Sequence, residues 1–200
     1  MDKTYNFGWA QCWHSTLAVI FEKVKIKNAL EFGLGDGTEY LLDNVDFLLS
    51  VELSVSELNK DWTEKIQYSL KERNTWKLEY VDCPQSIVDS NILIQKNQNQ
   101  IDNKTYLKDL HFLIDRYLID NKWDLVFVDP GIHHRGDIVS RCMEKDIDII
   151  VAHDTKFSEI YGYNLISNDK YHKIEQALHN GTTIWVKKTY FNFDVIVKSF

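Results

Sequence analysis

The sequence predicts an α/β fold: a doubly wound, mostly parallel seven-stranded sheet that ends in an antiparallel β-hairpin. Three observations support this fold class. Five short apolar segments alternate with segments of helical pattern, as expected of successive βα units. The first apolar segment runs into a turn with three glycines at residues 31–38 (EFGLGDGT). Two strand-like segments near the end flank Asn180-Gly181, which is a strong hairpin signal.

Sequence patterns place the individual elements along the chain. Helical patterns cover residues 9–25, 39–42, 58–70, 104–119 and 138–143. Apolar runs predict parallel strands from residue 28 into the glycine turn and over 47–52, 76–81, 124–129 and 147–152. Residues 170–178 and 182–188 are expected to pair as the hairpin. Residues 86–94 are ambiguous, the polar segment 95–103 predicts a surface loop, and the apolar tail 190–200 is expected to pack down or to continue into further sequence.

Length and cysteine content bound the domain organisation and the compartment. Two hundred residues suffice for one domain with a substantial core. We expect a single domain over 1–200, with residues 1–26 as an N-terminal helical cap and 28–188 as the core. The three cysteines, Cys12, Cys83 and Cys142, are odd in number and follow no zinc spacing. They predict reduced thiols in an intracellular, cytoplasmic protein.

Charge and hydropathy argue against two classes of partner. A net charge of −7 disfavours a nucleic-acid backbone, because phosphate binding needs a basic surface. No apolar run approaches the roughly 20 residues that a membrane-spanning helix needs. We therefore expect neither nucleic acid nor a membrane as partner.

The glycine turn indicates a site for a nucleotide-like ligand. Glycine has no Cβ, so the backbone can adopt a positive φ and let a ligand contact the main chain. Glu52 ends the next apolar run, where a carboxylate can accept hydrogen bonds from both ribose hydroxyls. A glycine-rich turn without a ligand, and an exposed carboxylate at a strand end, are the alternatives.

Two stretches of the chain resemble a known family. Residues 31–38 resemble motif I of the class I S-adenosylmethionine-dependent methyltransferases, whose fold is Rossmann-like. Residues 129–134 (DPGIHH) and 152–155 (AHDT) are similar to the ends of the fourth and fifth strands in small O-methyltransferases of glycan and natural-product biosynthesis. That family has a histidine three residues after the aspartate, where this chain has Ile132 followed by His133 and His134. The resemblance covers most of residues 28–188.

The resemblance implies S-adenosyl-L-methionine as the cofactor. The glycine turn would hold its methionine end, Glu52 the ribose, and Asp82 the adenine amino group, with the Cys83 backbone nearby. An alternative role for Asp82 is the N-cap of a helix that begins near Ser86. The complete set of expected cofactor residues is Glu31, Gly33, Gly35, Asp36, Gly37, Thr38, Glu52, Leu53, Asp82 and Cys83.

Carboxylates follow all five predicted parallel strands, at the edge where open α/β sheets bind their ligands. The expected catalytic set lies after the fourth and fifth strands and comprises Asp129, His133, His134, His153 and Asp154. A hydroxyl is a poor nucleophile at neutral pH, so it needs a general base such as histidine, or a divalent cation that stabilises the alkoxide. Asp129 and Asp154 are candidate ligands for Mg²⁺ or Mn²⁺, although His153 is a poor ligand for a hard cation.

These residues predict S-adenosylmethionine-dependent O-methylation of a small-molecule acceptor, with a sugar or glycan as the preferred class. A compact domain of this size could also be part of a larger glycan-assembly protein. One alternative is a metal-dependent hydrolase that uses the His/Asp cluster, but it leaves the glycine turn and Glu52 unexplained. Another is a methyltransferase-like binding module without turnover. A missing glycine motif or missing strand-end carboxylates would have favoured this module, and neither is missing.

Overall fold

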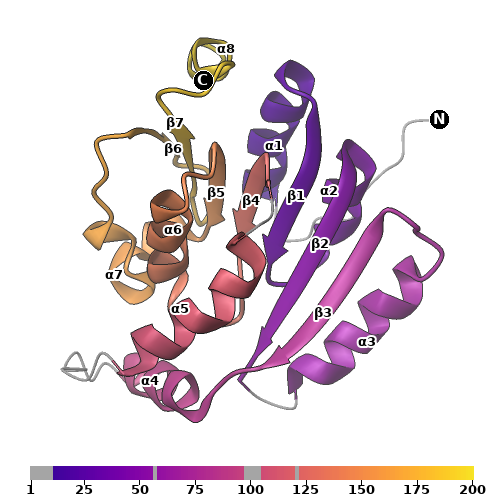
Figure 1. The fold of residues 1–200 in the computed structure, drawn as a ribbon, viewed down its shortest axis with the longest axis vertical. Helices are drawn as coiled ribbons and strands as arrows, with labels where there is room; N and C mark the ends of the chain where they lie inside the picture. Colours follow the sequence, from indigo (N-terminus) through magenta and orange to yellow (C-terminus); the bar gives the residue numbers. More distant parts are fainter. Residues whose placement is uncertain (1–10, 56–57, 97–104, 120–121) are drawn as a thin grey trace.

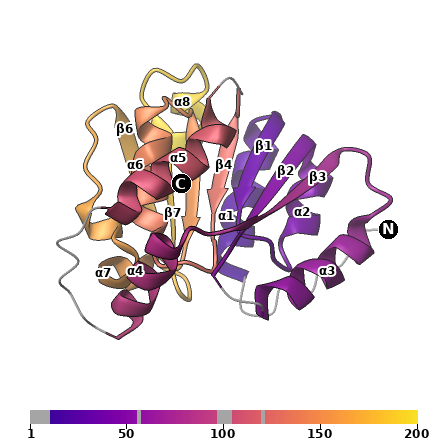
Figure 2. The ribbon, with the colours of Figure 1, turned by 60° about the horizontal axis from the view of Figure 1, so that its bottom comes forward.

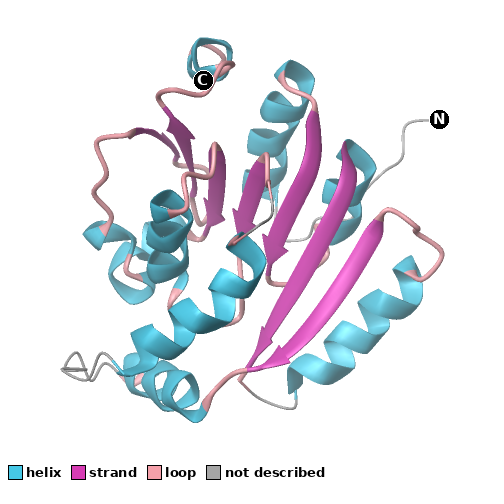
Figure 3. Ribbon diagram, in the orientation of Figure 1, coloured by secondary structure: helices cyan, strands magenta, loops and turns pink. Residues whose placement is uncertain are grey.

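Seven strands form one sheet in the order β3-β2-β1-β4-β5-β7-β6 (Figure 3). The computed structural model describes residues 11–55, 58–96, 105–119 and 122–200. Strands β1 to β5 are mutually parallel, and β7 runs antiparallel to both β5 and β6. Their bounds are β1 Ile26–Phe32, β2 Val45–Ser54, β3 Trp76–Asp82, β4 Leu125–Val128, β5 Ile149–His153, β6 Tyr171–Gln176 and β7 Thr182–Lys187. The predicted sheet and its terminal hairpin are confirmed.

Helices cover both faces of the sheet and give three layers (Figures 1 and 2). One face packs against α4 (Gln85–Gln95), α5 (Thr105–Leu118) and α6 (Arg135–Glu144). The other face packs against α1 (Gln11–Lys23), α2 (Thr38–Asn44), α3 (Leu58–Leu70) and α8 (Phe193–Val197). Between β5 and β6 lie two 3₁₀ turns, Thr155–Phe157 and Tyr163–Leu165, and the short α7 (Ser158–Tyr161). The chain is therefore doubly wound, as predicted.

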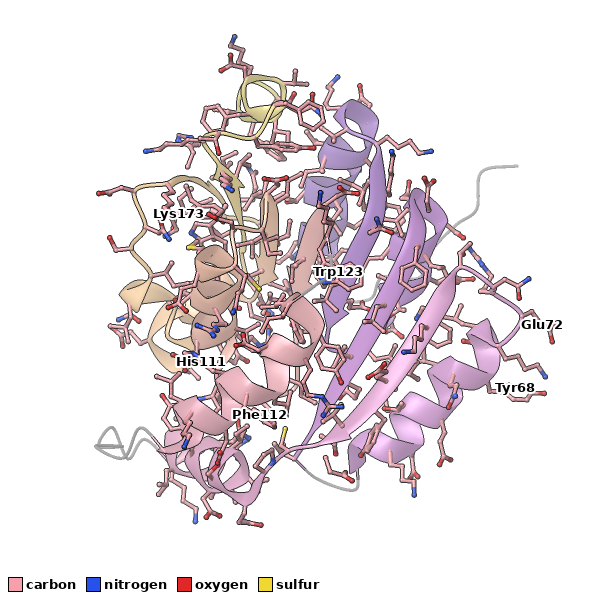
Figure 4. All side chains as sticks on the ribbon, in the orientation of Figure 1. Tyr68, Glu72, His111, Phe112, Trp123 and Lys173 are labelled. Atoms are coloured by element: carbon pink, nitrogen blue, oxygen red, sulfur yellow. The ribbon has the colours of Figure 1, made fainter. Side chains whose placement is uncertain are left out.

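The apolar pattern explains which segments lie at the centre of the sheet. All four residues of β4 and all five of β5 are buried, because helices cover both of their faces. On α5, Leu110 and Ile114 point into the core, whereas Phe112 is 75% exposed. Figure 4 shows Phe112 on the outer side of this helix. The predicted helix over 104–119 is thus an amphipathic layer helix.

Several predicted bounds differ from the observed ones. The ambiguous segment 86–94 is helical and forms α4. Strand β2 continues two residues beyond Glu52, because Leu53 and Ser54 still pair with β3. The hairpin turn is a five-residue loop, 177–181, in which His179 and Gly181 have positive φ, so it is longer than a two-residue Asn-Gly turn. Most of the predicted surface loop 95–103 and the first two residues of the predicted helix 9–25 lie outside the described residues.

The C-terminal segment packs onto the domain. This was one of the two expectations for the tail 190–200. Ile196 of α8 is 1% exposed and belongs to a core cluster that also includes buried residues of α1 and β7. Among the described residues, no helix is both long and apolar enough to cross a membrane.

Strand register brings the predicted site residues to one edge of the sheet. Phe32 at the end of β1 pairs with Val51 of β2 and with Val128 of β4. Val128 in turn pairs with Ala152 of β5. The residues that follow these positions are Gly33, Glu52, Asp129 and His153. They therefore lie along the carboxyl edge of the parallel strands, where open α/β sheets bind ligands.

Candidate active site

The glycine loop begins at Gly33, in a backbone conformation and a space that only glycine tolerates. Gly33 has φ +97°, and a Cβ placed on it would lie 2.2 Å from the carbonyl oxygen of Asp129. Its N–H donates to Val51 O at 2.9 Å, and Asp129 N–H donates to Phe32 O at 2.8 Å. The loop is therefore pressed against the residue that follows β4, so the two halves of the predicted site share a backbone contact.

Glu31 and Thr38 brace the loop from within. Glu31 is 2% exposed and accepts hydrogen bonds from Ser50 Oγ at 2.5 Å and Thr38 Oγ1 at 3.0 Å. Thr38 Oγ1 also accepts the Gly35 N–H at 3.1 Å. Burial raises the pKa of Glu31 to about 8, despite the bonds from Ser50 and Thr38. Both residues were predicted to bind the cofactor; the structure places their side chains beneath the loop, where they fix its shape.

Glu52 joins the loop to β2. Its side chain is buried, and Oε2 accepts the Leu34 N–H at 2.7 Å. Trp62 Nε1 of α3 donates to the Leu34 carbonyl at 3.1 Å, so the backbone of one loop residue is held from two elements. The next residue, Leu53, is fully buried in the core on the opposite face of β2. Of this predicted pair, only the Glu52 side chain lies at the loop.

The rest of the loop alternates between open and packed positions. A Cβ on Gly35 would meet no atom of the described residues closer than 4.0 Å, and Asp36 is exposed. A Cβ on Gly37, by contrast, would lie 2.2 Å from the indole of Trp13 on α1. Sequence reasoning did not assign this role to Trp13. The loop is thus open at Gly35 and closed by α1 at Gly37.

The predicted adenine-side residues follow β3. Asp82 is exposed at the end of this strand. The Cys83 N–H donates to Ser54 O at 2.9 Å and so extends the β2–β3 pairing. Pro84, not Asp82, holds the N-cap position of α4, so the capping alternative for Asp82 does not apply. Burial, together with the charges of Glu52 and Asp82, raises the pKa of the Cys83 thiol to about 12, which makes it unreactive.

These contacts fit a nucleoside cofactor with a small charged end. The backbone is open at Gly35, a carboxylate stands beside it at Glu52, and a second carboxylate ends the next strand at Asp82. This combination provides close main-chain approach at one end and acceptors for hydroxyl and amino groups at the other.

The other half of the site is a cluster of four side chains from the carboxyl ends of β4 and β5 and from the start of α6. His153 Nδ1 lies 3.0 Å from Asp129 Oδ2, and His153 Nε2 lies 3.6 Å from Asp154 Oδ1. Arg135 Nη1 lies 2.5 Å from Asp129 Oδ1 and 3.0 Å from Asp154 Oδ2. Asp129, His153 and Asp154 were predicted as catalytic residues, and the structure brings them together. Arg135 was missed.

The backbone and two tyrosines hold this cluster in place. Asp154 has φ +58°, a left-handed conformation that aspartate tolerates better than most residues. Tyr163 donates its hydroxyl hydrogen to the His153 carbonyl at 3.0 Å. The guanidinium of Arg135 stacks over the ring of Tyr161, with 4.2 Å between its Cζ and the ring centroid. The side chains therefore converge from elements that are fixed independently.

The other two predicted histidines lie outside the cluster. Asn91 Oδ1 of α4 lies 2.7 Å from His133 Nδ1 and accepts the His133 N–H at the same distance. His134 is buried, and its ring stacks on Tyr106 with 4.4 Å between centroids. Burial lowers the pKa of His133, and it lowers that of His134 to about 4. The hydrolase alternative, which needs both histidines in one metal site with His153 and Asp154, is therefore not supported.

The residues present do not fit a divalent cation. Asp129, His153 and Asp154 could each offer one ligand atom, all within 4.8 Å of one another. However, Arg135 Nη1 already bonds an oxygen of each carboxylate. A metal ion bound to the same two carboxylates would have to displace this positive charge or lie against it.

A cavity of about 250 Å³ lies beside the cluster. Its lining includes the aromatic side chains of Tyr106, His133 and Tyr161 and the carboxylates of Asp137 and Glu159. Tyr161 also stacks on Arg135, so the cavity and the cluster share a wall. A small ring could therefore bind next to the cluster.

Solved structures share this fold. An O-methyltransferase from Bacillus cereus in complex with S-adenosylhomocysteine matches with a TM-score of 0.53 and 13% identity, over 92% of this chain and 84% of its own. An S-adenosylhomocysteine-bound methyltransferase from Podospora anserina matches with a TM-score of 0.53 and 12% identity, over 93% and 80%. An rRNA methylase from Streptococcus thermophilus matches with a TM-score of 0.52 and 11% identity, over 94% and 98%. No protein-family model and no curated protein sequence matches the chain.

The protein thus has the fold of the class I S-adenosylmethionine-dependent methyltransferases, and the resemblance seen in its sequence is confirmed at this level. At identities of 11–13%, these matches establish the fold alone. They include an O-methyltransferase and an rRNA methylase, so the fold leaves the acceptor open.

Proposed function

We propose that the protein is an S-adenosylmethionine-dependent O-methyltransferase that acts on a hydroxyl of a small acceptor. The observation that carries this proposal is the shared edge of the sheet, where Gly33 of the cofactor loop touches Asp129 of the Asp–His cluster. A cofactor held by the loop and a hydroxyl beside the cluster would therefore be neighbours. Proximity of the two reactants is the main requirement for methyl transfer.

The cofactor would be held by the open backbone at Gly35 and by Glu52, with Asp82 at the adenine end. When bound, it supplies a methyl group already activated by the sulfonium. The buried bonds from Ser50 and Thr38 to Glu31 keep the loop in shape before the cofactor arrives. Such preorganisation reduces the ordering cost of binding.

His153 is the side chain best placed to take the proton of the acceptor hydroxyl. Of the two ring nitrogens, Nδ1 is closer to a carboxylate (Asp129 Oδ2 at 3.0 Å, against 3.6 Å from Nε2 to Asp154 Oδ1), so we assign the hydrogen to Nδ1, which donates it to Asp129. Nε2 is then the unprotonated nitrogen and can act as general base. An aspartate that orients a histidine in this way also stabilises the imidazolium that forms.

A sugar or glycan is the acceptor class that the neighbouring cavity suits best. The aromatic rings of Tyr106 and Tyr161 line this cavity and provide apolar surface against which a sugar ring can pack. The carboxylates of Asp137 and Glu159 can accept hydrogen bonds from its hydroxyl groups. A phenolic acceptor would use the same rings but would offer Asp137 and Glu159 fewer hydroxyl groups than a sugar does.

Calorimetry and a turnover assay test the proposal together. S-adenosylhomocysteine should bind with a dissociation constant in the micromolar range, about −8 kcal/mol. The chain should then transfer a labelled methyl group to one member of a panel of mono- and oligosaccharides. Absence of S-adenosylhomocysteine binding would contradict the proposal. Binding without transfer to any hydroxylated acceptor would favour the alternative of a binding module without turnover.

A further inference from the structure

A single nitrogen of Arg135 lies between the two carboxylates that would have to hold a metal ion. Nη1 contacts Asp129 Oδ1 at 2.5 Å and Asp154 Oδ2 at 3.0 Å, so one positively charged group bridges the two carboxylates. The side chain of Arg135 is 8% exposed. Because a guanidinium stays protonated at all physiological pH values, this positive charge is permanent.

Several neighbours keep the guanidinium in this position. Arg135 is the first residue of α6, and Gly136 follows it. A Cβ on Gly136 would lie 2.5 Å from the carbonyl oxygen of Gly162, so the start of α6 is pressed against the segment after α7. Tyr161, the last residue of α7, covers the face of the guanidinium. The close helix contact and the aromatic cover limit the ways in which Arg135 could move aside.

The charges around Arg135 also argue against a second cation. Asp129 and Asp154 would together attract a divalent ion, but the guanidinium between them already compensates one of their two negative charges. A divalent ion that used the same oxygens would lie within a few ångströms of Nη1, in a buried setting where repulsion between like charges is poorly screened. His153, the third ligand candidate, is engaged with Asp129 at 3.0 Å.

We propose that Arg135 is a resident cation that takes the place of a divalent metal at the Asp129–His153–Asp154 cluster. It holds the two carboxylates together and, through Asp129, keeps His153 in position for the proton transfer. The link to methyl transfer rests on the proposed function, whereas the exclusion of metal does not. Arg135 acts through the cluster and is a positioning residue.

Manganese binding tests the proposal without reference to activity. Mn²⁺ titrated into the wild-type protein should show no site with a dissociation constant below about 1 mM. Arg135→Ala and Arg135→Gln remove the charge and free the two carboxylate oxygens, so each should bind Mn²⁺ at least about tenfold more tightly than wild type. Arg135→Lys keeps a positive charge and should remain close to wild type.

A second substitution assigns the new site. Arg135→Gln/Asp154→Asn should lose the Mn²⁺ binding that Arg135→Gln gained, because one of the two freed carboxylates is gone. Near-ultraviolet circular dichroism shows which variants are folded, and the Gln variant, closer in size to arginine, serves if the Ala variant is not. Tight Mn²⁺ binding to wild type that Asp154→Asn abolishes would overturn the proposal. So would a folded Arg135→Gln that binds no Mn²⁺.

Activity measurements separate this proposal from the proposed function. If the protein transfers methyl groups, EDTA should leave turnover unchanged in wild type. Arg135→Gln should lower kcat more than it changes the affinity for S-adenosylhomocysteine, and Arg135→Lys should restore part of the loss. Complete loss of wild-type turnover in EDTA, recovered with Mg²⁺, would contradict the resident-cation proposal but leave the proposed function intact. Failure of the protein to bind S-adenosylhomocysteine would contradict the proposed function but leave the resident-cation proposal intact.

Discussion

Glu52 of β2 accepts a 2.7 Å hydrogen bond from the backbone N–H of Leu34 in the glycine loop. The bond fixes the loop relative to the strand and leaves the carboxylate at the edge where a ribose would lie. Trp62 holds the same residue through a hydrogen bond to the Leu34 carbonyl. A single carboxylate is therefore placed to serve both the loop and the cofactor.

Replacement of Glu52 should weaken cofactor binding. Glu52→Ala removes charge-assisted hydrogen bonds and should reduce the affinity for S-adenosylhomocysteine by about 1.5–3 kcal/mol, which calorimetry can measure. Glu52→Gln keeps the oxygen that accepts the Leu34 N–H and should lose less. The exposed Glu72, at the outer edge of the molecule in Figure 4, gives a matched control in Glu72→Ala. Unchanged affinity in Glu52→Ala would remove Glu52 from the cofactor site.

The glycine loop offers two positions with opposite expectations. Gly37→Ala would drive a Cβ into the indole of Trp13 and should destabilise the fold by about 1–3 kcal/mol in urea unfolding. Gly35→Ala meets no described atom closer than 4.0 Å and should leave stability nearly unchanged. The larger Gly35→Val should instead abolish S-adenosylhomocysteine binding, because the side chain fills the space next to the open backbone. Equal stability of the two alanine variants would contradict the observed packing.

The buried Glu31 predicts a pH dependence of stability. Its pKa is raised from 4.5 to about 8 by burial, so the unfolded chain ionises at lower pH than the folded protein does. Between about pH 4.5 and pH 8 the unfolded state is progressively favoured, and the contribution to stability is lost as the pH rises. Glu31→Gln should remove this part of the decline, on the order of a few kcal/mol, in urea unfolding at several pH values. A variant that keeps the wild-type slope would show that Glu31 ionises normally in the folded state.

Much of the fold could be predicted from local patterns of apolar and polar residues in the sequence. The runs in β4 and β5 are apolar throughout because helices cover both faces of these strands, and their ends mark the edge of the sheet. Asp129 and His153 could therefore be placed side by side from the sequence. The burial of Leu53 was also accessible, since alternation along β2 sends Glu52 and Leu53 to opposite faces.

The features that the sequence did not reveal depend on packing between distant elements. Arg135 reaches Asp129 and Asp154 because α6 begins at Arg135 and points its first turn at the strand ends. The available signal was a lone arginine after β4 among acidic strand ends, but its direction depends on the start of the helix. Trp13 covers Gly37 only because α1 crosses the loop, and helical periodicity predicts a buried face without naming its neighbour.

The final prediction concerns which histidine takes the proton. His153 is held by Asp129, whereas His133 is held by Asn91 and lines the cavity. His153→Ala should lower turnover by about 10²–10⁴-fold, with the affinity for S-adenosylhomocysteine nearly unchanged. Asp129→Asn should also lower turnover, because an amide no longer stabilises the imidazolium.

The other histidines provide the contrast that this assignment needs. His133→Gln should act mainly on the KM of the acceptor, because His133 forms part of the cavity wall. His172 lies on β6 beside Phe193, apart from the cluster, so His172→Gln should behave as wild type. Steady-state kinetics with varied acceptor distinguish these cases. A larger loss of kcat in His133→Gln than in His153→Ala would move the general base from β5 to the loop after β4, since only the side chain that receives the proton should control the chemical step.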